Sequence, residues 1–484
     1  TEARSQIKGD PPCLCASVAR GGERRRTKTS MHILWVKMGG LWPSTTGGRV
    51  RSLQIVSELA RRHQVTVVTT HGPGDDPDGL VRELSHCHQV ISIPHVAPKR
   101  GSAAFPGTVA RSWLSTYPVD LWKWRVPKVR KQIRTLFNSG AVDLCVADFL
   151  FAAANVPMGG PVPVVLFEHN VEYLIWQRLC ALESSPWRRA LFEIEWRKLR
   201  AREADACRRA DLTIAVSADD RRRLEAIAPG IRAVAIPTGV DTAYFAPNGD
   251  SERADRLVFS GSMDWHPNED AVAYFADAIL PRIRADVPGV SLTVVGRNPS
   301  ARLREIASRT GICVTGTVDD VRPSMAEAAV YVVPLRAGGG TRLKIFEALA
   351  MAKAVVSTTV GAEGLALEPG RHFVAADDPR DFADAVVGLL RDPQRRGALG
   401  RAGRDLVETY YSWPTVAREF EDRCEEVVAH HAQERELANR RAHLSRAGSP
   451  RHRGSRVLAG EHAEIGWSHH HSRPAESAVA RRPA

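Results

Sequence analysis

The chain has 484 residues, of which 43% are hydrophobic and 25% are charged, a composition typical of a globular protein with two or three domains. No apolar run reaches the roughly 18 residues that a membrane-spanning helix requires. Of the net charge of +12, residues 1–30 carry +4 and residues 431–484 carry +5, which leaves +3 for residues 31–430. This distribution argues against a dedicated nucleic-acid surface, and we expect no nucleic-acid partner.

The eight cysteines are scattered along the chain, and their spacing predicts neither a disulfide framework nor a zinc site. A reducing cytoplasm is therefore the expected location. The two ends of the chain lack the periodicity of folded elements. We expect residues 1–30 to be a disordered leader ahead of a native start at Met31, and residues 431–484 to be a disordered basic tail.

The first half of the chain predicts a doubly wound α/β domain, because short apolar strands alternate with helical segments. Strands are expected at residues 31–36, 63–70, 90–93, 142–146, 162–167 and 212–216. Helices are expected at residues 49–61, 119–138 and 186–210.

The loop at residues 37–48 follows the first strand and contains two glycine pairs, Gly39-Gly40 and Gly47-Gly48. Their spacing differs from Gly-x-Gly-x-x-Gly, so a dinucleotide fingerprint is absent. The glycines could cradle an anion at the N-terminus of the next helix, or they could simply form tight turns.

Glu168-His169-Asn170 directly follows the expected strand at 162–167. The carboxyl edge of a parallel sheet is where α/β proteins bind ligands. His169 could therefore relay a proton or bind a substrate, and a purely structural histidine is the alternative.

Aromatic and basic side chains alternate between residues 111 and 137. They are Trp113, Tyr117, Trp122 and Trp124 among Arg111, Lys123, Arg125, Lys128, Arg130, Lys131 and Arg134. This mixture suits a membrane interface or an anionic acceptor. A surface helix whose tryptophans pack inward is the alternative interpretation.

A second α/β series begins after a polar linker at residues 246–256. Strands are expected at residues 257–260, 291–295, 312–315, 330–333 and 354–358. Helices are expected at residues 271–284, 341–352, 379–390 and 414–429. Two consecutive series predict two similar domains that face each other across a cleft.

A glycine-rich loop connects the strand at 330–333 to the helix at 341–352. Gly338, Gly339 and Gly340 allow the backbone to approach a ligand closely. Thr341 is a plausible N-cap, and Arg342 and Lys344 add cations to a helix N-terminus that already favours anions. Glu347 could accept hydrogen bonds from hydroxyl groups. An ordinary βαβ unit with a flexible loop is the alternative.

These residues resemble the GT-B retaining glycosyltransferases, specifically glycosyltransferase family 4 and its members in bacterial exopolysaccharide or envelope-glycan assembly. The resemblance covers about residues 31–430 and is carried mainly by residues 334–364 and 260–268. It implies an N-terminal acceptor domain at 31–235, completed by a returning helix at 411–430, and a nucleotide-sugar domain at 236–410.

The resemblance also implies an activity: transfer of a sugar from a nucleoside-diphosphate sugar to a glycan or lipid-linked acceptor. No metal or other cofactor is expected, and the N-terminal domain could contact the inner face of the membrane. His169, Arg342 and Lys344 are the expected catalytic residues. The expected donor-binding residues are Gly39, Gly40, Gly47, Gly48, Gly261, Gly338, Gly339, Gly340, Thr341 and Glu347.

Two departures from the family pattern stand out. The family has two glutamates separated by seven residues; the second position is Glu347 here, but the first position is occupied by Gly339. The family also carries an Arg and a Lys after the first strand of the second domain. These positions fall near Ser262 and near Pro267 or Asn268, so neither cation is present, and we expect Arg342 and Lys344 to substitute for them. A nucleotide-sugar 2-epimerase and an inactive nucleotide-sugar-binding protein remain as alternatives.

Overall fold

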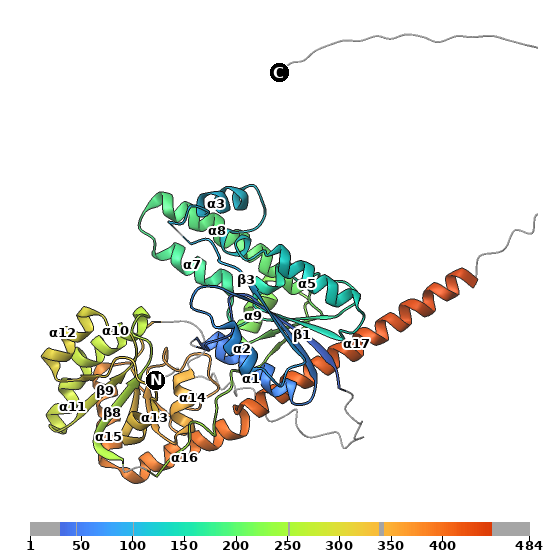
Figure 1. Cartoon of the computed structure of the whole chain (residues 1–484). Helices are drawn as coiled ribbons and strands as arrows, with labels where there is room; N and C mark the ends of the chain where they lie inside the picture. Colours follow the sequence, from blue (N-terminus) through green and yellow to red (C-terminus); the bar gives the residue numbers. More distant parts are fainter. Residues whose placement is uncertain (1–29, 45, 100, 250–251, 338–342, 448–484) are drawn as a thin grey trace, which may run out of the picture. The chain divides into compact units, whose positions relative to one another are not determined.

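Two parallel β-sheets organise the part of the chain that the computed structural model describes, which comprises residues 30–44, 46–99, 101–249, 252–337 and 343–447. The first sheet has the strand order β3-β2-β1-β4-β5-β6-β7, and the second has the order β10-β9-β8-β11-β12-β13. Figure 1 shows strands of both sheets among the helices that cover them. Apolar runs rich in valine and isoleucine form strands that are covered on both faces, as is typical of parallel sheets. The two sheets confirm the predicted α/β class with two Rossmann-like domains.

The first sheet and its helices extend over the first half of the chain. The strands are β1 (His32–Lys37), β2 (Gln64–His71), β3 (Gln89–Pro94), β4 (Leu144–Asp148), β5 (Val164–Phe167), β6 (Leu212–Ala215) and β7 (Ala233–Ala235). The helices are α1 (Gly47–Ala60), α2 (Pro77–Glu83), α3 (Phe105–Trp113), α4 (Val119–Trp122), α5 (Pro127–Asn138), α6 (Leu150–Ala153), α7 (Glu172–Leu182), α8 (Pro186–Arg209) and α9 (Ala218–Ile227).

The second sheet and its helices follow. The strands are β8 (Arg253–Ser260), β9 (Ser291–Val295), β10 (Cys313–Val314), β11 (Ala328–Val333), β12 (Ala354–Ser357) and β13 (Val374–Ala375). The helices are α10 (His266–Tyr274), the π-helical turn η2 (Phe275–Ile279), α11 (Leu280–Asp286), α12 (Ala301–Thr310), α13 (Arg322–Glu327), α14 (Leu343–Ala350), α15 (Pro379–Arg391), α16 (Pro393–Tyr410) and α17 (Trp413–Ala447).

Two segments that were each predicted to form a single helix are divided into shorter helices in the structure. The segment 119–138 forms α4 and α5, because Pro127 occupies the first turn of a new helix, where its missing N–H and fixed φ are tolerated. The segment 271–284 is divided among α10, η2 and α11, and Pro281 lies in the first turn of α11.

Helix α17 packs its first turns against the first sheet. Phe420 lies 5.6 Å from the ring of Trp35 on β1 and 5.1 Å from the ring of Phe167 on β5. Trp413 and Val427 belong to the same buried cluster. The last helix thus contributes to the core of the N-terminal domain, although it lies far from that domain in the sequence.

The prediction that the chain is disordered from residue 431 onward is wrong for the first part of that tail. Helix α17 continues to Ala447, so residues 431–447 are helical rather than unstructured. The remainder of the tail, residues 448–484, and residues 1–29 of the expected leader lie outside the described residues. None of the described helices combines the length and the apolar character needed to cross a membrane.

Each sheet has one position where the strand order reverses, and ligands of doubly wound folds bind outside the carboxyl ends of the strands at such positions. In the first sheet this position lies between β1 and β4, where Lys37 pairs in register with Asp148. In the second sheet it lies between β8 and β11. The fold therefore directs attention to the residues that follow these four strands.

Candidate active site

A buried polar cluster lies where β1 and β4 end. Nζ of Lys37 donates a hydrogen bond to Oδ1 of Asp148 at 3.1 Å, and Nε1 of Trp35 donates one to Oδ2 at 2.9 Å. Nε2 of His169, just beyond β5, lies 2.9 Å from Oδ1 of the same carboxylate. All four residues are buried, so Asp148 fixes the ends of three strands to one another.

Burial and charge determine the protonation of this cluster. Burial alone would raise the pKa of Asp148, but the combined effects of Lys37, His169 and Ser52 outweigh burial and hold that pKa well below its ordinary value. Burial lowers the pKa of His169 to about 3, although Asp148 opposes the shift. The imidazole is therefore neutral near pH 7, and the carboxylate of Asp148 is ionised. Burial lowers the pKa of Lys37, and Asp148 opposes that shift.

Phe149 holds the imidazole in place. Its ring stacks on His169 with centroids 4.0 Å apart, and Nζ of Lys37 lies 3.9 Å above the same ring. The backbone of Phe149 has a φ of 76°, an unusual conformation for a residue with a side chain. Strain of this kind persists only where the surrounding packing enforces it, and it is enriched at functional sites.

The two predicted glycine pairs have different structural roles. A Cβ on Gly48 would lie 3.1 Å from Phe149 and 3.6 Å from Nδ1 of His169, so glycine lets the start of α1 approach the histidine. A Cβ on Gly47 would lie 3.2 Å from Leu343. Gly39 and Gly40 have φ values of 87° and 80° and form a turn after β1. The anion-cradle interpretation of these glycines stays a prediction.

A small cavity of about 160 Å³ brings His169 next to the second half of the chain. Gly47, Gly48 and Arg51 of α1 line it together with His169 and Asn170. Leu343, the first described residue of α14, lines the same cavity. The histidine and the start of the helix that carries Lys344 and Glu347 thus meet at one site.

Lys344 lies against the loop that follows β8. Its Nζ donates a hydrogen bond to Oδ1 of Asn268 at 2.7 Å and lies 4.2 Å from the centre of the Phe259 ring. A Cβ on Gly261 would lie 2.7 Å from this Nζ, so glycine at 261 leaves the space that the ammonium group occupies. A cation is therefore present beside the 261–268 loop, although the loop itself lacks the cations expected from the family.

Glu347 lies one turn further along α14. Burial raises the pKa of its half-buried carboxyl group to about 7, and Lys344 opposes the shift. Among the described residues, its side chain makes no hydrogen bond or ion pair. The carboxylate is thus free to accept hydrogen bonds from a ligand. The predicted Gly338, Gly339, Gly340, Thr341 and Arg342 lie outside the described residues.

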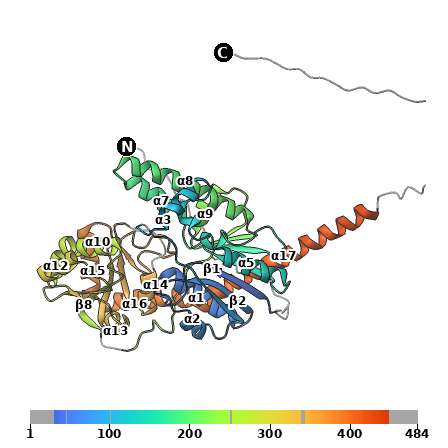
Figure 2. The ribbon, with the colours of Figure 1, turned by 45° about the horizontal axis from the view of Figure 1, so that its top comes forward.

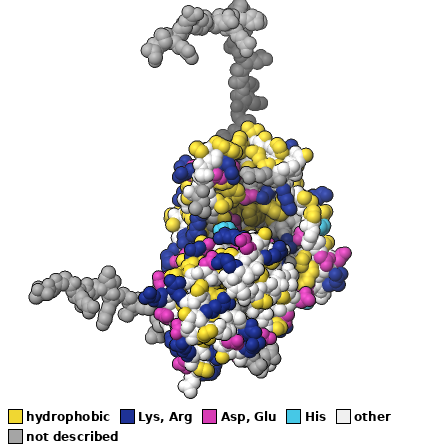
Figure 3. All heavy atoms as spheres, turned by 90° about the vertical axis from the view of Figure 1, so that its left-hand side faces the viewer, with side chains coloured by type: hydrophobic (Ala, Val, Ile, Leu, Met, Phe, Trp, Pro, Cys, Tyr) yellow, Lys and Arg dark blue, Asp and Glu magenta, His cyan; other side chains and the backbone are white. Residues whose placement is uncertain are grey.

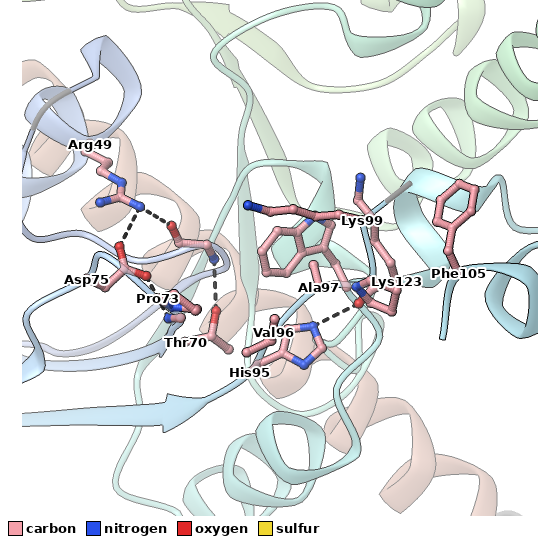
Figure 4. Close-up of a pocket in the computed structure, with 14 residues that line it drawn as sticks. Arg49, Thr70, Pro73, Asp75, His95, Val96, Ala97, Lys99, Phe105 and Lys123 are labelled. Carbon is pink, nitrogen blue, oxygen red and sulfur yellow. Dashed lines mark hydrogen bonds and ion pairs between the residues drawn. The ribbon is translucent and has the colours of Figure 1, made fainter. Parts of the chain in front are cut away.

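A second and larger pocket, of about 490 Å³, opens at the carboxyl ends of β1, β2 and β3 (Figure 4). Its walls include the basic residues Arg49, Lys99 and Lys123 and the apolar residues Val96, Phe105 and Trp124. This mixture suits a ligand with both polar and apolar parts.

Arg49 anchors one wall of this pocket. It donates a hydrogen bond to the carbonyl oxygen of Gly39 and forms an ion pair with Asp75, both at 2.7 Å (Figure 4). A Cβ on Gly40 would lie 2.7 Å from the Asp75 carboxylate, so the turn at 39–40 is shaped to admit this ion pair. A tight turn at Gly39-Gly40 therefore leaves room for the ion pair between Arg49 and Asp75.

Most aromatic residues predicted between 111 and 137 pack inward, but one does not. The guanidinium of Arg125 lies 4.4 Å from the ring of Tyr117 and 4.8 Å from that of Trp122, and both rings are half-buried. Trp124 packs beside His95. Trp113, by contrast, is 54% exposed.

Lys37 and Asp148 were missed by the sequence analysis. The strand expected at 142–146 ended two residues before Asp148, and Lys37 was assigned to the loop. The available signal was a charged residue at the end of each apolar strand. The sequence alone does not show that the two residues meet, because that depends on which strands are neighbours in the sheet.

One group among the described residues, formed by His63, Glu421 and Glu425, has the geometry to hold a metal ion. Glu421 already forms ion pairs with Arg62 at 2.6 Å and with His63 at 3.1 Å. We therefore regard the group as a structural link between α1, β2 and α17.

Two family matches cover most of the chain between residues 45 and 392. Residues 45–244 match Glycosyltransferase Family 4, and residues 254–392 match Glycosyl transferases group 1. The chain belongs to the glycosyltransferases. The matches confirm the resemblance to glycosyltransferase family 4, while retention of configuration and a role in exopolysaccharide or envelope-glycan assembly stay predictions.

Curated relatives include two kinds of mannosyltransferase. Phosphatidyl-myo-inositol mannosyltransferase of Mycolicibacterium smegmatis is 33% identical over 218 residues, which are 43% of this chain and 55% of that protein. GDP-mannose-dependent alpha-(1-6)-phosphatidylinositol monomannoside mannosyltransferase of Mycobacterium tuberculosis is 28% identical over 238 residues, 44% of this chain and 61% of that protein. The chain thus spans little more than half the length of these relatives.

Solved structures share the fold at low sequence identity. Sucrose-phosphate synthase from Thermosynechococcus elongatus has a TM-score of 0.61 and 16% identity, and covers 83% of this chain and 100% of its own. HepE from Anabaena in complex with UDP has a TM-score of 0.57 and 15% identity, and covers 82% of this chain and 100% of its own. These likenesses confirm the predicted GT-B fold.

Proposed function

We propose that this protein transfers a sugar from a nucleoside-diphosphate sugar to a lipid-linked or glycan acceptor, with retention of the anomeric configuration. The observation that carries the proposal is the cavity shared by His169 and Leu343. It brings a neutral histidine of the first domain to the start of α14, and α14 carries a cation and a carboxylate suited to a nucleotide. The role fits polysaccharide or envelope biosynthesis on the cytoplasmic side of a membrane.

Lys344 stabilises the leaving group in this proposal. A nucleoside diphosphate gains negative charge as the glycosidic bond breaks, and a prearranged cation stabilises that charge. Lys344 is held by Asn268 and lies in the first described turn of α14, where the helix dipole also favours an anion. We propose that this positive charge makes an obligatory metal ion unnecessary.

Glu347 binds the ribose of the donor. A carboxylate can accept hydrogen bonds from two adjacent hydroxyl groups, and the carboxylate of Glu347 has no partner among the described residues to compete with them. Its pKa of about 7 means that a substantial fraction is ionised under physiological conditions.

His169 orients the reacting sugar or the acceptor hydroxyl. Asp148 lies beside Nε2 and favours the tautomer that carries its proton there, which leaves Nδ1 as a hydrogen-bond acceptor on the other side of the ring. Retention by front-face attack requires no protein nucleophile, in contrast to the carboxylate pair of retaining glycosidases. Asp148 itself is fully buried and is held by Lys37 and Trp35.

The donor and acceptor classes follow from the pockets and the relatives together. The mixed basic and apolar pocket at the ends of β1, β2 and β3 suits an amphipathic acceptor. Two relatives are named for phosphatidylinositol acceptors, and one of them for GDP-mannose. We therefore place GDP-mannose first among candidate donors and a phospholipid-linked acceptor first among acceptors.

A thermal-shift screen of GDP-, UDP- and ADP-sugars tests the donor proposal. A donor present at about 100 times its Kd should add about 2.7 kcal/mol to the free energy of unfolding. Release of free nucleoside diphosphate only when an acceptor is added would support transfer. Release without an acceptor would favour an epimerase or hydrolase, and absence of any nucleotide-sugar binding would overturn the proposal.

A further inference from the structure

Helices α3, α7 and α8 expose an unusual concentration of large hydrophobic side chains. Six of the twelve exposed large hydrophobic side chains among the described residues lie on these helices or, for Leu114, directly after α3. We call them the apolar surface: Trp113, Leu114, Ile175, Leu179, Trp187 and Ile194. Leu114 is 91% exposed and Trp187 is 67% exposed. Such a concentration marks an interaction site rather than a random scatter.

The three helices form one local assembly. Nζ of Lys198 on α8 donates a hydrogen bond to the carbonyl oxygen of Ser112 on α3 at 3.1 Å. The rings of Trp176 on α7 and Phe192 on α8 lie 5.7 Å apart and join the two helices along their inner sides. Both ribbon views show α3, α7 and α8 together at one end of the N-terminal domain (Figures 1 and 2).

The exposed residues form stripes on these helices. Ile175 and Leu179 are four residues apart on α7, and Trp187 and Ile194 are seven apart on α8, so each pair lies on one helix face. The space-filling view shows hydrophobic side chains gathered at this end of the molecule, with Lys and Arg side chains beside them (Figure 3).

Unpaired cations accompany the apolar surface. Arg111, Arg178 and Arg189 are exposed and make no ion pair among the described residues. The acidic Glu183, directly after α7, and Glu193 of α8 are already paired with arginines, at 3.1 and 2.7 Å. Arg178 lies between Ile175 and Leu179 in the sequence, so its positive charge accompanies the apolar stripe of α7.

We propose that the apolar surface docks on an anionic phospholipid bilayer. Exposed Trp and Leu side chains with interleaved arginines match the apolar and anionic layers of a lipid surface, whereas a protein partner would not require unpaired cations of one sign. Helix α3 also connects this surface to the larger pocket, because Phe105 begins α3 and lines that pocket. A lipid-linked acceptor can then enter the pocket without leaving the bilayer, and this consequence alone rests on the proposed function.

Co-sedimentation of the full chain with phospholipid vesicles tests the proposal. The protein should bind vesicles of phosphatidylcholine mixed with phosphatidylglycerol, should bind pure phosphatidylcholine vesicles less well, and should be released by salt. Replacing Trp113→Ser with Leu114→Ser, or Trp187→Ser with Ile194→Ser, should weaken binding about tenfold or more. Reversing Arg111, Arg178 or Arg189 to Glu should weaken it on the order of fivefold per substitution.

Matched controls exist elsewhere on the protein. Val81 and Tyr410 are 49% and 58% exposed, and Val81→Ser and Tyr410→Ser should bind vesicles like the unmodified protein. Because the chain ends carry positive charge, the comparison among variants decides the outcome rather than binding alone. Equal vesicle binding by all variants would overturn the proposal. The proposal would also be overturned if the unmodified protein formed a concentration-dependent dimer and only the variants with serine in the apolar surface failed to form it. Donor-induced thermal shifts should be the same in every variant, so failure here and failure of the proposed function are distinguishable.

Discussion

Nζ of Lys344 lies 2.7 Å from Oδ1 of Asn268 and thereby links the first turn of α14 to the loop after β8. The two residues are 76 positions apart in the sequence, and they meet at the position where the strand order of the second sheet reverses. The contact explains how a loop without its own cation can still present positive charge to a diphosphate.

Lys344→Ala should weaken donor binding, because it removes the positive charge from the diphosphate position. Loss of one charge-assisted hydrogen bond is typically worth about 1.5–3 kcal/mol, so we expect the donor KM to rise by about one to two orders of magnitude. Steady-state kinetics with varied donor concentration measures this. Lys128→Ala removes an exposed lysine of α5 and serves as the control. A donor KM that Lys344→Ala leaves unchanged would contradict the assignment.

Gly261→Ala should act on the same site through sterics. The added Cβ would lie 2.7 Å from both Nζ of Lys344 and Nδ2 of Asn268, so these side chains must shift. We expect a weaker donor affinity, by about tenfold. We also expect a lower melting temperature, because residues with a side chain rarely adopt the φ of 155° that Gly261 has. Isothermal titration with the donor and thermal unfolding separate the two effects. Gly316→Ala, at a position with a positive φ of 74° and open space around the Cβ, is the matched control.

Glu347 should make donor binding depend on pH near neutrality. Burial raises its pKa to about 7, and only the ionised carboxylate accepts hydrogen bonds from both ribose hydroxyls. The donor Kd should therefore fall as the pH rises from 6 to 8. Glu347→Gln should bind the donor more weakly and without this pH dependence. If the donor Kd of the unmodified protein and that of Glu347→Gln changed with pH in the same way, Glu347 would not have this role.

The same pKa has a consequence for stability without ligand. A carboxyl group whose pKa is raised by folding binds more protons in the native state than in the unfolded state between about pH 4.5 and pH 7. Its contribution to stability therefore falls as the pH rises through this window. Glu347→Gln should remove this part of the pH dependence, which denaturant unfolding at several pH values measures.

Asp148→Asn should destabilise the first domain. The substitution leaves the ammonium group of Lys37 buried without a counter-charge, and breaking one partner of a buried ion pair typically costs about 3–5 kcal/mol. Urea unfolding followed by tryptophan fluorescence measures the loss. Asp120→Asn breaks a more exposed pair with Lys123 and should change stability by less than about 1 kcal/mol. Similar losses in both variants would contradict a special role for the Lys37–Asp148 pair.

The sequence predicted the sheets well because their strands are short apolar runs whose identity depends on local composition. The segment Ser291–Val295 was predicted with the bounds that the structure has. Helix α16 was missed, because its sequence is rich in Arg and Gly and its apolar side is narrow. Helix α17 was cut short, because the polar segment after Ala429 lacks the apolar periodicity that guided the prediction.

The sequence pointed only to those residues of the candidate site whose signal is local. Glu347, Lys344 and His169 lie beside recognisable strand ends and glycine loops. The Lys37–Asp148 pair was missed, since it exists only because β1 and β4 pair although they are separated by more than 100 residues in the chain. The position of Lys344 beside Asn268 likewise depends on the packing of α14 against the end of β8.

The most direct test of the central claim is an assay of sugar transfer with labelled donors. The purified protein is incubated with radiolabelled GDP-mannose or UDP-glucose and a phospholipid or polyprenyl-phosphate acceptor, and the label in the lipid extract is measured. We predict acceptor-dependent label in the extract with release of nucleoside diphosphate, and a reduction of about tenfold or more in Lys344→Ala and Glu347→Ala. Transfer that both variants perform as well as the unmodified protein would contradict the account.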